Sequence, residues 1–244
     1  MNIRFLFKNT DYLKIPGLSF DYWISKASLA NFKRLVSEEL DCKTGLICGS
    51  NEKYIKSWSE IDYSKIVFGS RNWISFSGPA NKWAPYNHGG NKRKWYGSHS
   101  DVVLFEDNAR MMRKEKGAMF RNEQFYFKEG VTWNRVGSGN NFGARKTIQG
   151  FAFDDVSPCG FTKTEETVST SLAYLNSKVF ASYLRLFSNG FKVEIGQIQS
   201  CPFLKIDDGN KSRIDAFAKK CIDEEKQDWD SFETSWDFKK HPLI

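Results

Sequence analysis

The sequence predicts an α+β fold, in which a loop-rich, mostly antiparallel β core carries a long amphipathic helix and a helical C-terminal connector. Short β-type runs separated by clusters of Gly, Asn and Ser between residues 41 and 155 indicate the β core. Apolar residues at helical spacing indicate two helices further along the chain, at 164–188 and at 212–226. These changes of pattern divide the chain into residues 1–40, an N-terminal connector with an amphipathic helix; 41–205, the β-rich central domain; and 206–244, a helical, acidic and aromatic C-terminal connector.

The N-terminal connector begins with a short extended stretch around Arg4–Phe7, and the letters "IPG" at Ile15–Gly17 predict a turn. An amphipathic helix is expected over Ser25–Leu40, because Ser25 can cap it and apolar residues recur along one face. The residues of that face are Leu29, Phe32, Leu35, Val36 and Leu40.

The central domain is expected to form a small, irregular sheet with long loops. The β-type runs are "KIVFG", "NWISFSG", "SDVVLFE", "EQFYFKEGVTW" and "GFAFD". A basic interruption at Arg110–Lys116 is expected to form one or two helical turns.

The clearest helix is expected over Thr164–Ser188, where Thr162 and Glu165 fit a capping box and Asn189–Gly190 is a stop signal. The letters "EIGQIQSCPFLKI" then predict a turn and a strand. A last helix is expected over Ser212–Lys226. The final stretch is too acidic for a core element, but its aromatic residues could dock on the body; these are Trp229, Phe232, Trp236 and Phe238.

Composition predicts a soluble globular protein, with 40% hydrophobic and 27% charged residues in 244. No apolar run approaches the length of a membrane span, and the first residues do not resemble a secretory signal, so a cytoplasmic protein without membrane partners is expected. The five cysteines are scattered and no CxxC pair occurs, which argues against disulfides and zinc sites.

Charge is distributed unevenly along the chain. The formal net charge is +7, but residues 221–244 carry seven acids and three lysines, which leaves +11 over residues 1–220. A basic body with an acidic tail predicts an anionic partner for the body, and nucleic acid is the first expectation. The alternative is that the positive charge only keeps the protein in solution.

Motifs for catalysis are missing from the sequence. There is no nucleophile elbow, no acid–base pair of carboxylates, and neither the glycine-rich loop nor the Asn/Asp-Pro-Pro-Tyr/Phe tetrapeptide of an amino-methyltransferase. His88, His99 and His241 do not stand at metal-ligand spacing. We therefore predict no catalytic residue, no metal and no cofactor in this chain. Whether it is an enzyme stays open on these grounds.

The residue types that bind DNA are abundant between Arg71 and Lys146, interleaved with aromatics. Lys and Arg neutralise phosphates, Arg and Asn can read base edges, and aromatic rings add stacking or shape. We predict double-stranded DNA as a partner. The candidate DNA-binding residues are Arg71, Lys92, Arg93, Lys94, Arg110, Arg113, Arg121, Arg135, Asn141, Arg145 and Lys146.

Two loops stand out within this region. The stretch "WAPYNHGGNKRKWYG" at Trp83–Gly97 combines cations, glycines and four aromatic residues. The glycine-rich "GSGNNFGAR" at Gly137–Arg145 matches no nucleotide-binding fingerprint. It can be a flexible loop that brings Asn140, Asn141 and Arg145 to DNA, or an ordinary hairpin loop.

Several long stretches resemble a known family in their order along the chain. They are "LKIPGLSFDYWIS", "KTGLICGSNEKYIKSWSEID", "WAPYNHGGNKRKWYG", "FRNEQFYFKEGVTWNRV", "GARKTIQGFAFD", "AYLNSKVFASYLRLF", "EIGQIQSCPF" and "DWDSFETSWDFKKHPL". Together they resemble the C-terminal region of BREX-type, PglX-like phage-defence DNA adenine methyltransferases, and the match covers essentially the whole chain. Gly196, Gln197, Ile198 and Pro202 after the helix also resemble the end of a recognition domain in restriction-modification specificity subunits.

The resemblance implies a target-recognition region whose catalytic domain is absent. In the family, the S-adenosylmethionine-binding domain precedes the matched region. We therefore expect a fragment or split subunit, which selects the DNA site while a separate domain uses S-adenosylmethionine to methylate adenine N6. Residues 41–205 would be the DNA target-recognition domain. The partners implied are DNA, a methyltransferase domain and other defence-system subunits.

The resemblance also suggests roles within the Trp83–Gly97 loop. Lys92, Arg93 and Lys94 would hold phosphates, while Trp95 and Tyr96 would anchor the loop to the body. Base reading is expected among four residues, and the sequence does not say which. They are Arg121, Arg135, Asn141 and Arg145.

Two other classes of function compete with this hypothesis. The chain could be an interaction protein whose apolar helices and aromatic tail bind defence-system subunits or a phage inhibitor. It could also be an enzyme with a hydrolase site of its own, which metal-dependent nicking of DNA would reveal.

Overall fold

The computed structural model describes residues 13, 15–17, 23–78, 80–90, 92–136, 142–164, 167–188, 192–204 and 206–243. It confirms the α+β class, with antiparallel sheets and a long C-terminal helix. Several predicted features lie outside the described residues. They are the Arg4–Phe7 stretch, Asn140, Asn141, Glu165 and the Asn189–Gly190 stop.

The strands form two four-stranded sheets, ordered β1-β8-β5-β6 and β2-β4-β3-β7. Neighbouring strands are antiparallel in both sheets, except that β3 and β7 pair in parallel. The strands are β1 (Leu40–Lys43), β2 (Ile55–Ser57), β3 (Trp83–Asn87), β4 (Asp101–Leu104), β5 (Gly130–Trp133), β6 (Ala144–Thr147), β7 (Ala152–Phe153) and β8 (Cys159–Thr162).

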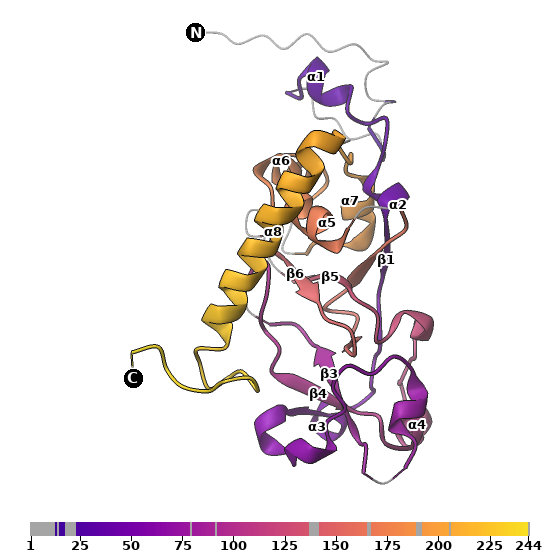
Figure 1. Cartoon of the computed structure of the whole chain (residues 1–244). Helices are drawn as coiled ribbons and strands as arrows, with labels where there is room; N and C mark the ends of the chain where they lie inside the picture. The colour runs from indigo at the N-terminus through magenta and orange to yellow at the C-terminus, as the bar shows by residue number, and fades with distance from the viewer. Residues whose placement is uncertain are drawn as a thin grey trace.

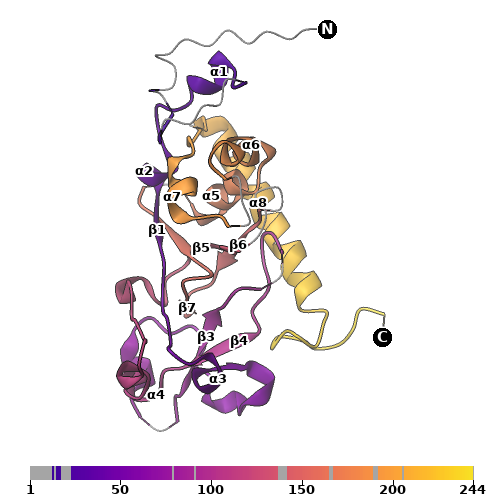
Figure 2. The same ribbon diagram turned by 180° about the vertical axis from the view of Figure 1, so that it is seen from behind.

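Helices gather at one end of the molecule, around the first sheet, while the second sheet and its short turns form the other end (Figure 1). The α segments are α1 (Lys26–Leu29), α2 (Val36–Glu39), α3 (Asn51–Tyr54), α4 (Glu106–Ala109), α5 (Val168–Leu175), α6 (Lys178–Phe187), α7 (Ile195–Ser200) and α8 (Asp208–Trp229). The 3-10 turns are η2 (Trp58–Glu60), η3 (Tyr63–Lys65), η4 (Trp73–Phe76), η5 (Met112–Lys114) and η6 (Glu123–Phe125). Figure 2 shows from behind that α8 runs along the outside from the helical end toward the second sheet.

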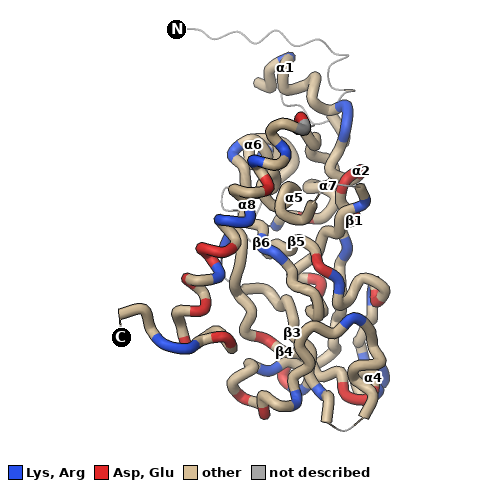
Figure 3. The backbone as a smooth tube through the Cα atoms, in the orientation of Figure 1, with Lys and Arg blue, Asp and Glu red and all other residues tan. Residues whose placement is uncertain are grey.

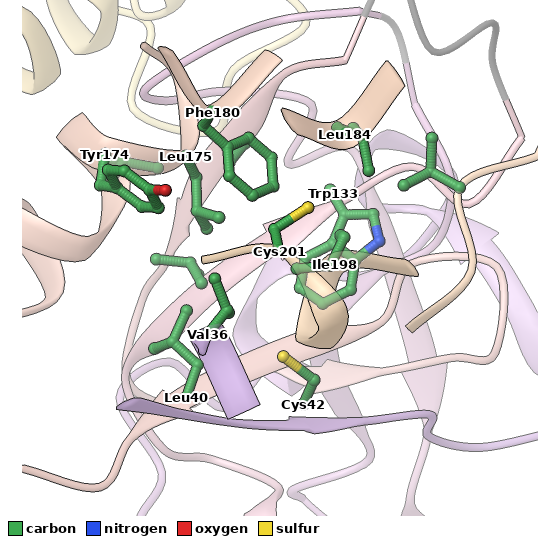
Figure 4. Packing of buried hydrophobic residues seen from close by; sticks show 14 of the residues in the cluster. Val36, Leu40, Cys42, Trp133, Tyr174, Leu175, Phe180, Leu184, Ile198 and Cys201 are labelled. Atoms are coloured by element: carbon green, nitrogen blue, oxygen red, sulfur yellow. The ribbon is translucent and has the colours of Figure 1, made fainter. Parts of the chain in front are cut away.

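The helical end has its own apolar core. Helix α5 packs on the first sheet and α8 packs on α5. Figure 4 shows Trp133 beside Cys201 and Ile198, with Leu184 and Phe180 above them. These side chains are all buried. Burial of so many large side chains is the main source of stability for this end.

The second core lies under the second sheet and is mostly aromatic. Trp73 is at its edge, with its ring 4.5 Å from that of Phe105 and 5.6 Å from that of Phe127. Phe76 stacks on Phe127 at 5.5 Å and is fully buried. Rings arranged in this way hold the long loops at this end in place.

The expected helix over Ser25–Leu40 is wrong as one element. Ser25 does cap α1, since its Oγ accepts from Ser28 N at 3.0 Å. The chain then extends, because Val36 N donates to Cys201 O at 2.9 Å and Phe203 N donates to Arg34 O at 2.8 Å. Pairing with this distant segment overrides the local helical pattern.

The expected helix over Thr164–Ser188 is two helices, α5 and α6. Thr162 belongs to β8 and the observed N-cap of α5 is Thr167, so the capping box is also wrong. The break falls at Asn176, whose side chain pairs with both the N–H and the C=O of Ala144 at the edge of the sheet. Ser177 then caps α6 by accepting from Phe180 N at 3.0 Å.

The predicted strands are confirmed in part. "SDVVLFE" contains β4, "GFAFD" contains β7, and "EQFYFKEGVTW" contains β5 after the 3-10 turn η6. "NWISFSG" forms η4 instead, because the Asn72 side chain accepts from Ile74 N at 3.0 Å and so bends the chain. "KIVFG" contributes only an isolated bridge at Ile66.

The structure also differs from two predictions for the C-terminal region. The expected strand in "EIGQIQSCPFLKI" is helix α7, opened by a capping box between Glu194 and Gln197. The last helix was correct in kind but is longer, running from Asp208 to Trp229. Within the described residues, no helix is both long and apolar enough to cross a membrane.

Candidate nucleic-acid interface

The stretch Trp83–Gly97 is not one loop. Its first part is β3, which is mostly buried and pairs with β4 and β7. His88 follows the strand and lies 2.5 Å from the Asp154 carboxylate, which raises the pKa of the imidazole. Burial raises the pKa of the Asp154 carboxyl. We call residues 88–97 the cationic segment. His88 therefore fastens the start of this segment to the body.

Arg93 is held by helix α8. Its guanidinium lies 2.8 Å from Asp228 Oδ2 and 3.3 Å from Glu225 Oε2. It also lies over the Trp229 ring at 5.2 Å. A phosphate would have to compete with two carboxylates for this side chain, so Arg93 acts first as an anchor.

The two predicted aromatic anchors are confirmed. Trp95 N donates to Ala144 O at 2.8 Å, which extends the first sheet by a bridge beside Arg145. Tyr96 is buried with Lys226 over its ring. Lys92 and Lys94 remain exposed on either side of Arg93, and Lys94 Nζ reaches Asn176 O at 3.4 Å.

The acidic tail docks on this anchored segment. Trp236 stacks on His99 with a centroid distance of 6.2 Å, and its ring lies 5.8 Å from that of Phe151. Trp58 Nε1 donates to Thr234 O at 2.9 Å. Burial and Arg145 lower the pKa of His99 to about 3, so its ring is neutral. The sequence suggested docking of these aromatics without indicating where.

Arg145 is the largest departure from the predicted surface. Its side chain is 1% exposed, and Nη2 donates to Gly89 O at 3.1 Å and to Asn134 Oδ1 at 3.0 Å. Burial lowers the pKa of the guanidinium to about 10, which still leaves it charged. An inward-facing Arg145 does not have the exposed position that base reading would need.

Two more candidates are tied into ion pairs. Arg135 lies 2.8 Å from Glu194 Oε2 and 3.5 Å from Asp155 Oδ2, and the hydrogen bond with Glu194 raises its pKa. Lys146 lies 3.2 Å from Glu129 Oε1. Both side chains are half-buried. Their first role is to hold loops at the edge of the first sheet.

The remaining candidates lie at the end of the molecule that holds the second sheet. We call this region the tip and define it as residues 71–78 and 106–125. Within it, η4 packs against α4, and Arg113 joins the parts by lying over the Phe120 ring at 4.0 Å while pairing with Glu123. Asn141, another candidate, lies outside the described residues.

The tip exposes cations together with apolar side chains. Arg71, Lys114 and Arg121 are exposed, and none of them has an ion-pair partner among the residues that the structure describes. Arg110 is exposed and pairs with Asp107 at 2.9 Å. The exposed apolar side chains of the tip are Ile74, Met111 and Met119. These three residues have no signal in the sequence, because an isolated apolar residue in a loop forms no pattern.

Helix α8 also carries a row of acidic side chains. Figure 3 shows them along the part of α8 that approaches the second sheet. Asp223 and Glu224 are exposed there, and Asp228 is half-exposed beside Arg93. A polyanion is repelled from this face of α8.

The described residues do not fit an S-adenosylmethionine site. Such sites are built at the carboxyl ends of parallel strands that are joined through helices and carry a glycine-rich loop. Here the strands are paired almost entirely antiparallel, and the first sheet holds no parallel pair among its named strands. The structure also shows no group of three metal-binding side chains in its described part.

The chain is similar to two adenine-specific methyltransferases. It is 31% identical over 255 residues to adenine-specific methyltransferase PglX of Lacticaseibacillus casei (strain Zhang), an alignment that covers all of this chain and 21% of that protein. The chain is a homologue of part of such a methyltransferase. With adenine-specific methyltransferase BrxX of Escherichia coli O9:H4 (strain HS) the identity is 34% over 245 residues, or 98% of this chain and 19% of that protein. The chain thus spans about one fifth of the length of these relatives. No family model matches the chain.

Proposed function

We propose that this chain is the DNA target-recognition region of a BREX-type adenine-specific methyltransferase. In this proposal the chain selects the DNA site, and residues 41–205 form the recognition domain. Transfer of a methyl group from S-adenosylmethionine to adenine N6 takes place in a catalytic domain that corresponds to another part of the relatives. The target base leaves the duplex to reach that domain.

The observation that supports the proposal is a group of exposed cations in the tip and the neighbouring loop that have no ion-pair partner among the described residues; it includes Arg71, Lys92, Lys114 and Arg121. Of the candidate arginines, Arg93, Arg110, Arg113 and Arg135 are paired with carboxylates and Arg145 is buried. Arg71 and Arg121 are therefore the candidate arginines most available to phosphate. They project from loops around the second sheet, whose aromatic core keeps those loops in place. Loops held by a rigid scaffold are the usual carriers of binding residues.

The proposal narrows the list of direct contacts. Arg71, Lys92, Lys94, Lys114 and Arg121 form the expected contact set, and Arg110 lies beside them in an exposed ion pair with Asp107. Arg93, Arg113, Arg135, Arg145 and Lys146 hold the loops that present them. Phosphate contacts set the position of the protein on DNA, and base contacts set the sequence preference. Of the exposed set, Arg121 is the residue expected to read a base edge, since a guanidinium can pair bidentately with guanine.

Fluorescence anisotropy tests this proposal with a pool of random duplexes at about 50 and 200 mM salt. Affinity is expected to fall on the order of 100-fold or more across that range, because several phosphate contacts release counterions. Replacing both Arg71 and Arg121 by Ala should weaken binding strongly. The matched control replaces Arg185 and Arg213, two exposed arginines of the helical end, and removes the same charge. Equal losses in the two double variants would mean that only net charge matters.

One observation favours a second function, that of a protein-interaction module. Phe217 of α8 is 65% exposed. In this alternative, α8 binds a defence-system subunit or a phage inhibitor. Phe217→Glu should then abolish capture of that partner without changing DNA affinity. Deleting residues 228–244 would be a poor test, because Trp229 and Trp236 pack on the body.

A further inference from the structure

A cavity of about 400 Å³ lies between the tip and the neighbouring residues Tyr54 and Leu104. Tyr54, Leu104 and Met112 form apolar parts of its wall. Glu106, Asp107 and Arg110 add hydrogen-bonding groups. A cavity of this size, with apolar walls and a few polar groups, suits a flat group of low polarity whose edge makes hydrogen bonds.

The backbone that lines the cavity is strained. Asp107, Asn108 and Ala109 adopt left-handed conformations in succession, with φ values of 53°, 58° and 60°. Asp and Asn tolerate this region, but Ala does not favour it, and each left-handed residue costs on the order of 1 kcal/mol. Strain of this kind is concentrated at ligand sites and switch regions.

The left-handed turn brings the polar groups together. Within it, Ala109 N donates to Phe105 O at 3.0 Å. Four residues close in sequence consequently line one cavity, namely Glu106, Asp107, Arg110 and Met111. An extended loop would spread the same four residues over a longer surface, so the strained turn is what assembles the wall.

The charges of the lining are already balanced. Arg110 Nε lies 2.9 Å from Asp107 Oδ2, and Lys82 Nζ lies 2.5 Å from Glu106 Oε1. The cavity therefore does not call for a strongly charged ligand. Carboxylate oxygens can accept further hydrogen bonds and the guanidinium can donate more, so both donors and acceptors on a ligand edge can be satisfied.

The surroundings indicate what such a ligand is attached to. Arg71, Lys114 and Arg121 are exposed on the same tip. A neutral, flat, hydrogen-bonding ring within a cationic surface has the chemistry of a nucleobase on a phosphate backbone. A base inside a paired duplex cannot enter a cavity, so the base must have left the stack.

We propose that this cavity receives one extrahelical nucleobase of the bound DNA. The inference rests on the proposed function, since it requires that the tip meets DNA. Tyr54 and Met112 would provide apolar contact with the ring, while Asp107 and Arg110 would pair with its edge. A flat side chain of a protein partner is the competing occupant, and the experiment separates the two.

The test compares three labelled duplexes of the same sequence by fluorescence anisotropy with the whole chain. The first is fully paired, the second carries a single bulged adenine, and the third carries an abasic residue in the same bulge. The abasic duplex keeps the bend and the phosphates and removes only the base. The adenine bulge is expected to bind about 10-fold more tightly than the abasic bulge, in line with the worth of one stacked base.

Two variants locate the effect. Met111→Trp places a large ring at the cavity and should remove the difference between the adenine and abasic bulges. Met119→Trp makes the same change on a residue of the tip that does not line the cavity, and the difference should persist. Met111 is 57% exposed and Met119 is 47% exposed, so both variants are expected to fold.

Each outcome bears on the proposal. Equal affinity for the adenine and abasic bulges, with good binding to the paired duplex, would overturn the cavity assignment while leaving DNA recognition intact. A preference for adenine that survives Met111→Trp would place the base elsewhere and also overturn it. Failure to bind any of the three duplexes would reject the proposed function itself and leave a protein side chain as the occupant.

Discussion

The cationic segment 88–97 and the tip look alike in sequence, since both are basic, aromatic and rich in turn residues. In the structure they differ in what surrounds them. Arg93 in the segment faces the acids of α8, and the neighbouring Arg145 is buried beneath it. Arg71 and Arg121 in the tip face solvent. The same residue types therefore support the fold in one region and remain available for a ligand in the other.

The difference arises because another part of the chain covers the segment and no comparable described element covers the tip. Helix α8 and the tail cover the segment with Glu225, Asp228, Trp229 and Trp236. Among the described residues no comparable acidic element covers the tip, whose acids are used within it or by its neighbours. We expect substitutions of the buried or ion-paired residues of the segment to lower stability, and substitutions of the exposed cations of the tip to lower DNA affinity.

The largest expected effect is the loss of Trp229. Its ring is 9% exposed and packs against Arg93 and Gly97, and a Cβ at Gly97 would lie 3.1 Å from this ring. Trp229→Ala should lower the free energy of unfolding by about 4 kcal/mol, because it leaves a large cavity. Phe217→Ala on the exposed face of the same helix should change it by less than about 0.5 kcal/mol. Urea denaturation measures the free energy of unfolding of both variants. Equal losses would mean that the packing of Trp229 against the segment does not stabilise it.

Arg145→Ala should have the next largest effect on stability. It removes the donors to Gly89 O and Asn134 Oδ1 and leaves a cavity, so a loss of about 3 kcal/mol is expected. Arg121→Ala should leave the unfolding midpoint nearly unchanged and lower DNA affinity. The opposite pattern, with a stable Arg145→Ala protein that no longer binds DNA, would show that Arg145 turns outward to contact the duplex.

Lowering the pH should lower the free energy of unfolding through protonation of His99. Its pKa is about 3 in the folded chain, against about 6.5 when unfolded, so the unfolded chain binds the extra proton between these values. Stability is therefore present above pH 6.5 and is lost as the pH falls toward 3. At pH 5 the loss should be about 2 kcal/mol. His99→Phe, which fits among Tyr96, Phe151 and Trp236, should lack this dependence in thermal melts. Identical pH profiles for the two proteins would rule out His99 as the cause.

Local patterns predicted the class and several elements. The β4 and β7 runs and the last helix carried clear periodicity, while the family resemblance suggested Trp95 and Tyr96 as anchors. The breaks in the two predicted long helices came from distant partners. Cys201 pairs with Val36, and Ala144 pairs with Asn176. Such pairings leave no trace in the spacing of apolar residues near the break.

The candidate site was predicted less well, for a related reason. Whether an arginine is a contact or a support depends on what faces it, and that partner can lie far along the chain. Arg93 meets Glu225 from α8, 132 residues later. The sequence predicted the acids of the C-terminal region as part of a connector, and only the fold shows that two of them pair with Arg93. The left-handed turn at Asp107–Ala109 had no signal, since Ala does not mark such a conformation.

The smallest expected effect separates neighbouring residues of the same segment. Arg93→Ala should cost about 1 kcal/mol of stability, since its ion pairs are partly exposed and its stacking on Trp229 adds a little. Lys92→Ala, whose side chain is exposed without a described partner, should leave stability unchanged. It should instead weaken binding to all DNA sequences about equally and reduce the salt slope by about 1. If Lys92→Ala altered the preferred sequence, Lys92 would be reading bases. If Arg93→Ala changed the salt slope as much as Lys92→Ala and left stability intact, the segment would meet DNA with both cations, and its contrast with the tip would disappear.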